Sequence, residues 1–155
     1  MSNLPRFIAY AAAFEEAYAS DQWQALTEHF HEDAVYEVGL PLLGTERCEG
    51  RDRILEWFAD VVDRFDRRFE TRTLKGIEGP VEEGNRIWLR GAAVYTSDVA
   101  PDFELVLKET LHIDDGRIRL LVDEYEPEMI ASADAYNASY GEVLGLRLGE
   151  PNSSA

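Results

Sequence analysis

The spacing of the large apolar residues changes once along the chain, and this change most constrains the fold. Up to about residue 65 these residues recur every three to four positions, as on one face of a helix; Phe7, Tyr10, Phe14 and Tyr18 form the first such series. From about residue 69 onward, apolar and polar residues alternate, as they do in strands. Helices in the first half and strands in the second predict an α+β protein, with helices packed on an antiparallel sheet.

The pattern places three helices and one short strand before four further strands and a final helix. Helices are expected over about 7–18, 21–32 and 54–65, a strand over 33–39 and a loop over 40–50. Asp21 and Gln24 have the spacing of a capping box. Strands are expected over 69–78, 86–97, 104–114 and 117–125, with turns at Gly79–Pro80 and Asp115–Gly116. Pro127 then begins a helix over about 127–148.

The length and net charge of the chain limit the number of domains and the kinds of partner that we expect. The chain has 155 residues, which suits a single domain over 1–150, with 151–155 as a frayed tail. The net charge is −16, so nucleic acid and anionic membranes are not expected as partners. The lone Cys48 cannot form an intramolecular disulfide, which favours a reducing compartment and a cytoplasmic protein. No apolar run approaches the ~20 residues that span a bilayer.

Glu109 is the most informative single residue, because it interrupts an otherwise apolar strand face. A lone carboxylate on such a face is costly unless it is paired. Two interpretations follow: a pocket acid with a raised pKa, or a structural ion pair with Arg90 or another arginine across the sheet. The face comprises Phe103, Leu105, Leu107, Glu109, Leu111 and Ile113.

Asp123 and Arg90 are the other two candidate catalytic residues. Asp123 acts as a general base if the last strand turns Leu121, Asp123 and Tyr125 inward. A shift of one residue would turn Glu124 inward instead and leave Asp123 as a solvated strand-end carboxylate. Arg90 is expected to pair with an anion, which could be Glu109, Asp123 or a ligand carboxylate; of these, a structural ion pair is favoured.

Several other kinds of site find no support in the sequence. His29 and His31, two residues apart on an expected helix, point to different sides, so no metal site is expected. Cys48 lacks a histidine in a suitable context, and no serine lies in a nucleophile motif. The glycines form neither a phosphate-binding loop nor a dinucleotide fingerprint, so no cofactor is expected.

Three segments together resemble one known superfamily. The first comprises Asp21–Leu26 and His29–Tyr36, the second is Gly50–Ile54 and the third is His112–Ile118. The element order and these segments resemble the nuclear transport factor two-like superfamily, which includes SnoaL-like polyketide cyclases and ketosteroid isomerases. The resemblance covers roughly residues 5–127. It implies a cone-shaped, curved antiparallel sheet with three N-terminal helices on its concave face, a C-terminal helix, and a homodimer formed through the sheet.

The catalytic residues of the superfamily are only partly present. At the three positions used by ketosteroid isomerases this chain has Phe14, Val38 and Glu109, so the tyrosine and the aspartate base are missing. At the positions used by limonene-epoxide hydrolases it has Arg90 and Asp123, but Ala92 replaces an aspartate. This chain therefore lacks part of the catalytic set of each of the two enzymes.

The expected function is that of a cofactor-independent SnoaL-like enzyme using acid/base chemistry on an apolar cyclic substrate. The reaction would be an isomerisation, cyclisation, dehydration or epoxide opening, with Asp123, Glu109 and Arg90 as catalytic residues. The alternative is a non-catalytic module that binds a ligand or dimerises, which the missing isomerase residues favour. Apolar and tyrosine side chains are expected to line the cavity: Tyr10, Phe14, Tyr18, Tyr36, Val38, Phe58, Trp88 and Tyr125.

Overall fold

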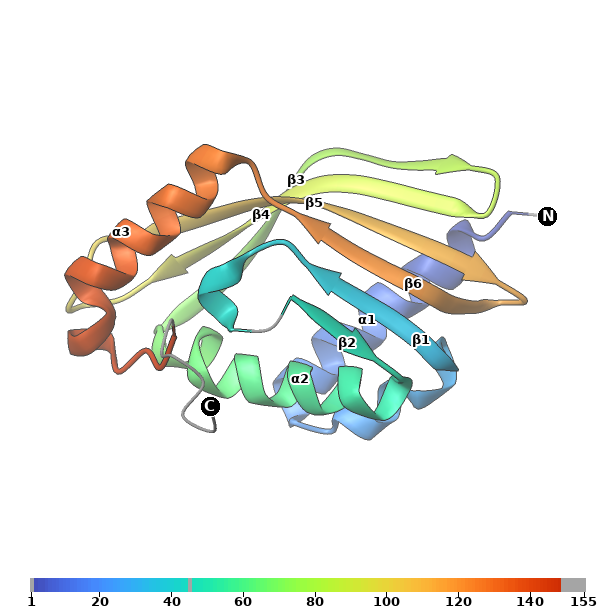
Figure 1. Ribbon diagram of the computed structural model, residues 1–155, viewed down its shortest axis with the longest axis horizontal. Coiled ribbons are helices and arrows are strands. Elements are labelled where there is room, and N and C mark those ends of the chain that lie inside the picture. The colour runs from blue at the N-terminus through green and yellow to red at the C-terminus, as the bar shows by residue number, and fades with distance from the viewer. Residues whose placement is uncertain (1, 45, 149–155) are drawn as a thin grey trace.

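The structure, a computed structural model, describes residues 2–44 and 46–148 (Figure 1). Two α-helices, α1 (Leu4–Ser20) and α2 (Arg51–Arg64), lie in the first half, and α3 (Pro127–Leu144) follows the last strand. The strands are β1 (Phe30–Val38), β2 (Arg47–Glu49), β3 (Thr71–Glu83), β4 (Arg86–Thr96), β5 (Phe103–Asp114) and β6 (Arg117–Glu124). Short 3-10 helices form over Trp23–His29, Pro41–Leu43 and Asp66–Arg68.

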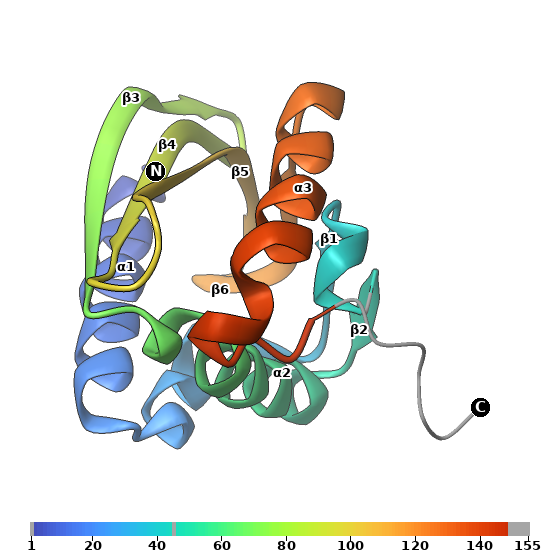
Figure 2. The same cartoon turned by 90° about the vertical axis from the view of Figure 1, so that its left-hand side faces the viewer.

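All six strands form one curved sheet in the order β2-β1-β6-β5-β4-β3. Every neighbouring pair is antiparallel except β1 and β6, which run parallel. The sheet bends around α1 and α2, while α3 lies beside the other end of the long strands (Figures 1 and 2). The predicted α+β class, with helices on the concave side of a curved sheet, is confirmed.

The helices form where the apolar stripes predicted them, with one change of type. On α2 the buried residues Ile54, Phe58 and Val61 follow the helical spacing and face the sheet. The second predicted helix is a 3-10 helix that ends at His29, since Phe30 already belongs to β1. The capping box does not form: Asp21 instead ends α1 in a left-handed conformation, and its carboxylate accepts a hydrogen bond from Trp23 Nε1.

Two strands differ from the prediction. The expected turn at Gly79–Pro80 is wrong, because β3 continues through it as an irregular stretch with two register shifts. Gly79 has a φ of +83°, and β3 is an edge strand, so the missing N–H of Pro80 leaves no partner strand unsatisfied. The expected loop over 40–50 contains the short strand β2, whose Cys48 pairs with Tyr36.

The C-terminal helix ends earlier than predicted. Gly145, with a φ of +74°, terminates α3 after Leu144, whereas 148 was expected. The predicted frayed tail, 151–155, lies outside the described residues. Within 2–44 and 46–148, no helix combines the length and the apolar character needed to cross a bilayer.

Candidate functional site

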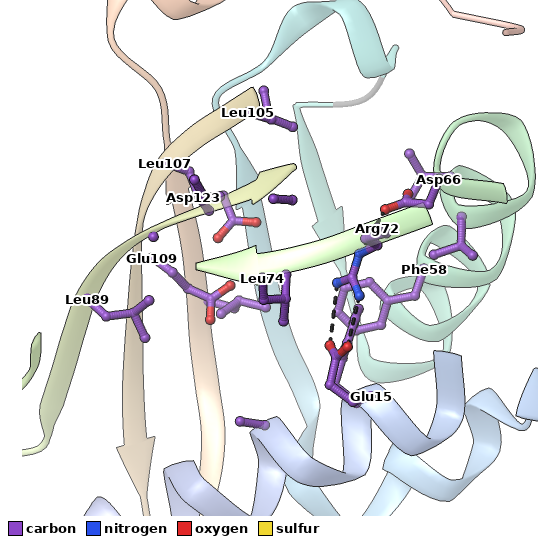
Figure 3. Close-up of a pocket in the computed structure, with 18 of the residues that line it drawn as sticks. Glu15, Phe58, Asp66, Arg72, Leu74, Leu89, Leu105, Leu107, Glu109 and Asp123 are labelled. Carbon is purple, nitrogen blue, oxygen red and sulfur yellow. Dashed lines mark hydrogen bonds and ion pairs between the residues drawn. The ribbon is translucent and has the colours of Figure 1, made fainter. Parts of the chain in front are cut away.

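A cavity of about 420 Å³ lies between the concave face of the sheet and helices α1 and α2 (Figure 3). This volume lies within the range of small-molecule sites. Its walls are mostly apolar and aromatic, with contributions from α1, α2 and strands β1, β3, β4, β5 and β6. Among the walls are the side chains of Tyr10, Phe14, Tyr36, Trp57, Phe58, Tyr95 and Tyr125.

Glu109 on β5 and Asp123 on β6 meet in this cavity as directly opposed residues of neighbouring strands. A bulge makes this pairing: Ile113 pairs with Ile118 but His112 pairs with Leu120, so β6 has one extra residue at that point. The extra residue turns Asp123 to the same face as Glu109 (Figure 3). Asp123 is 7% exposed, and Glu109 is half-buried at the cavity wall.

One hydrogen bond fixes the Asp123 carboxyl. The Tyr36 hydroxyl, on β1, donates to Asp123 Oδ2 at 2.5 Å. Asp123 Oδ1 is buried and, when both carboxyls are ionised, has no donor among the described residues. Tyr36 packs edge-on against Trp57, with ring centres 5.1 Å apart. The aromatic wall therefore holds the carboxylate in a defined orientation toward the cavity.

The two carboxyls have different pKa values although they share one environment. Burial raises the pKa of Glu109 well above its usual value, and the charge on Asp123 raises it further. Burial also raises the pKa of Asp123, to about 6, against the lowering effect of hydrogen bonds from Tyr36 and Glu109. The two carboxyls therefore lose their protons in separate steps, and Asp123 is the more acidic of the two.

A second polar cluster lies at the other side of the cavity wall in Figure 3. Arg72 on β3 donates to Glu15 on α1, with Nη1–Oε1 at 2.8 Å and Nη2–Oε2 at 3.4 Å. Asp66 accepts a hydrogen bond from the Tyr95 hydroxyl at 2.8 Å. Burial raises the pKa of Asp66 against the effects of Tyr95 and Arg72. The cluster joins α1 to the edge of the sheet.

Arg90 does not join the acidic pair. Its neighbour Leu89 is opposite Glu109, so Arg90 points to the outer face of the sheet, where its Nη1 lies 4.0 Å from Glu126 Oε1. The expectation that Arg90 pairs with Glu109 or Asp123 is corrected here. Alternation along β4 is the physical reason, since adjacent residues of a strand face opposite ways.

The predicted binding residues divide into two groups. Five of them line the cavity: Tyr10, Phe14, Tyr36, Phe58 and Tyr125. The other three are not among its lining residues. Tyr18 lies beside the guanidinium of Arg72, Val38 is buried in the core, and Trp88 lies under Lys108 on the outer face of the sheet.

Sequence reasoning missed Trp57, Asp66, Arg72 and Tyr95. Trp57 and Val61, four residues apart on α2, both line the cavity, so helical spacing carried a signal for Trp57. Tyr95 alternates along β4 with Ala93 and Gly91, which also line the cavity, so strand alternation was a signal for Tyr95. For Asp66 and Arg72 no local pattern exists, since their hydrogen-bond partners Tyr95 and Glu15 lie far away in the chain.

The arrangement can accept and donate a proton within one apolar enclosure. Asp123 is a buried carboxylate beside a carboxylic acid, which suits a base and an acid acting on neighbouring substrate atoms. Across the described parts of the chain, no three histidine, cysteine, aspartate or glutamate side chains gather as metal ligands.

Solved structures similar to this chain include ligand complexes and an epoxide hydrolase. TerC, co-crystallized with polyporic acid, is 17% identical, with 92% of this chain and 97% of that chain covered and a TM-score of 0.62. A ketosteroid isomerase-like protein from Catenulispora acidiphila, in complex with trimethylamine, is 17% identical, with 84% and 95% covered and a TM-score of 0.60. An epoxide hydrolase from M. tuberculosis is 18% identical, with 90% and 96% covered and a TM-score of 0.57.

These likenesses establish the fold, and a sequence profile establishes the family. No curated protein sequence matches the chain. The profile of the SnoaL-like domain matches residues 11–121, which is more than half of the chain and includes α2 and strands β1 to β5. The chain therefore belongs to the family of SnoaL-like domains.

Proposed function

We propose that this protein is a cofactor-independent enzyme that moves a proton on an apolar cyclic substrate held in the cavity. The proposal rests on Glu109 and Asp123, which lie directly opposite each other in the cavity. Their pKa values differ, so one carboxyl can act as an acid while the other acts as a base. The apolar walls favour the protonated Glu109 and exclude bulk water. Two structural relatives were solved with small organic molecules, which supports small-molecule binding here.

The proposed reaction begins at the Asp123 carboxylate. It removes a proton from a carbon next to a substrate carbonyl, while the Tyr36 hydroxyl remains hydrogen-bonded to Asp123. The electron pair of the broken C–H bond moves toward the carbonyl oxygen, and the Glu109 acid stabilises that charge by donating a hydrogen bond. Return of the proton to a different carbon of the same conjugated system completes an isomerisation with no atom gained or lost.

Hydrogen exchange into a ketone tests this proposal without knowledge of the natural substrate. The probe is α-tetralone in deuterated buffer, and NMR follows the loss of its α-hydrogen signal. We expect the protein to accelerate exchange and Asp123→Asn to abolish the acceleration. The rate should fall as the pH drops through about 6, because protonation removes the Asp123 base.

A matched control separates this site from general charge effects. Glu124→Gln removes a carboxylate next to Asp123 in sequence but exposed on the outer face, and it should leave the rate unchanged. If the cavity binds α-tetralone and no exchange occurs, the proposal fails and the non-catalytic ligand-binding module takes its place. Equal loss of rate in Glu124→Gln would also contradict it.

A further inference from the structure

Two polar bridges join α1 to the edge strand β3, and they lie far apart along both elements. At one end Arg72 binds Glu15, with Nη1–Oε1 at 2.8 Å. At the other end the Glu82 carboxylate accepts hydrogen bonds from the Ser2 hydroxyl, at 2.7 Å, and from the backbone N–H of Asn3. Between these bridges, no hydrogen bond or ion pair connects the described residues of α1 with those of β3.

The cavity opens to the surface between the two bridges. Of the residues that line it, the exposed ones are Leu74, Lys75 and Gly76, which follow Arg72 along β3. On α1 the half-buried Ala11, between the two bridges in sequence, also lines the cavity. A Cβ added to Gly76 would meet no atom within 4 Å beyond its chain neighbours. These small residues leave a window in the cavity wall, which we define by Ala11, Leu74 and Gly76.

The surface around this window is apolar. Five large apolar side chains are exposed among residues 2–44 and 46–148, and three of them belong to this stretch of α1 and β3: Ile8, Leu74 and Ile77. Ile8 lies one helical turn before Ala11, on the same stripe of α1. Leu74 extends from β3 to the same side as Arg72 (Figure 3). Single exposed apolar residues are common, but apolar surface that continues a cavity wall indicates a place where a ligand or partner binds.

The cations beside the window are already paired with carboxylates. Arg72 binds Glu15, and the Lys75 ammonium lies 2.9 Å from Glu104 Oε1. An anionic group would have to displace one of these carboxylates, and a chain of net charge −16 repels anions in any case. The chemistry of the window therefore suits a neutral, apolar occupant.

We propose that the ligand is a ring compound with an apolar chain, whose ring occupies the cavity and whose chain leaves through the window. The chain lies against Ile8, Leu74 and Ile77, in keeping with ligand sites that leave part of the ligand at the surface. It is attached far from the reacting carbonyl, because β4 separates β3 from the strand of Glu109. This inference rests on the proposed function where it directs the carbonyl to the acidic pair, but binding of the chain requires no turnover.

Calorimetric titration with a matched series of ketones tests the proposal. The probes are α-tetralone and its 6-methyl, 6-propyl and 6-pentyl derivatives, in which the chain is attached to the aromatic ring, para to the carbonyl group. A methylene group that loses half of its contact with water strengthens binding about twofold. The pentyl ketone should therefore bind about 16-fold more tightly than the methyl ketone.

Two variants change the window without touching the acidic pair. Gly76→Val fills it and should reduce this gain to below about threefold; Gly76 lacks the positive φ that would exclude a valine. Ile8→Gln removes one of the three apolar side chains and should reduce the gain to about fivefold. Val99→Gln is the matched control, because Val99 is 58% exposed, against 57% for Ile8, but lies in the loop between β4 and β5. An unchanged affinity for α-tetralone and an unchanged near-ultraviolet circular dichroism spectrum verify the fold of each variant.

The possible results separate this proposal from its rivals. Equal affinities across the series in the wild type, or no binding of any probe, overturn it. A gain that survives in Gly76→Val also overturns it, because the chain then lies inside the cavity or leaves elsewhere, and so does an equal loss in Val99→Gln. A light-scattering mass that falls in Ile8→Gln would show that a second copy of the chain covers this surface instead. The full gain without hydrogen exchange overturns only the proposed function.

Discussion

Neutralising Asp123 should stabilise the protein, and the gain should depend on pH. The carboxyl is buried beside Glu109, and no cation among residues 2–44 and 46–148 forms an ion pair with it; Arg90 lies on the other face of the sheet. The replacement Asp123→Asn keeps the shape of the side chain and an acceptor for the Tyr36 hydroxyl. It removes the charge that burial disfavours.

The magnitude follows from the pKa of Asp123. A rise from 3.8 in the unfolded chain to about 6 in the folded one corresponds to about 3 kcal/mol. Between these two values the folded state binds more protons than the unfolded state. The free energy of unfolding therefore decreases as the pH rises through this window, and the whole cost is present above about pH 7.

Two smaller effects modify that figure. Replacing a charged acceptor with a neutral one weakens the hydrogen bond from Tyr36 by about 1 kcal/mol. The charge on Asp123 also raises the pKa of Glu109, and its removal relieves that strain in the same direction as the main effect. We expect a net gain of about 2 kcal/mol near pH 8 and none near pH 4.

Urea unfolding, followed by tryptophan fluorescence at a series of pH values, measures this gain. Glu124→Gln is the control for the general effect of removing one acid from a chain of net charge −16. A loss of about 3 kcal/mol at neutral pH would refute the reasoning, because it would mean that Asp123 has a cationic partner in the folded protein. A gain of equal size at every pH would refute the assigned pKa.

Three further outcomes are expected. Tyr36→Phe removes the hydrogen bond that lowers the pKa of Asp123, so the acid limb of the exchange rate should move to higher pH, and a profile that stays in place would exclude this role. Gly79→Ala should destabilise by about 2 kcal/mol in urea, since φ is +83° and a Cβ would lie 2.9 Å from the Trp88 carbonyl oxygen; Gly84→Ala, at φ +64° with open space, should cost less. Size-exclusion chromatography with light scattering should give twice the mass of one chain if the sheet forms the proposed homodimer, and a monomer mass would end that proposal.

Local patterns were enough for the elements that bury one clear face. The stripe on α2 and the alternation along β4 and β5 predicted those elements to within a few residues, because packing of an apolar face is the main local signal. They failed at Gly79–Pro80, where an edge strand tolerated residues that usually end a strand. They also missed β2, which is too short to show a period.

The candidate site shows the same division. The sequence placed Glu109 on an apolar face, and the structure confirms that face, but the sequence could not choose its partner. Arg90 lies on the neighbouring strand and was an available cation. Only the register between β4 and β5 showed that Leu89 is opposite Glu109 and that Arg90 lies on the outer face of the sheet. Whether Asp123 or Glu124 turned inward depended on the register of the last hairpin.

That register illustrates what each level determined. A regular hairpin about Asp115–Gly116 would set Glu109 opposite Val122 and turn Asp123 outward, since partners across the turn would stay in step. The bulge before Leu120 shifts β6 by one residue and brings the two carboxyls together. The sequence by itself determined the α+β class, the amphipathic helices and an acid on the apolar face of β5, because these depend on local periodicity. Only the tertiary structure decided which acid faces Glu109 and that Arg90 lies on the other face of the sheet, because both depend on the register between strands.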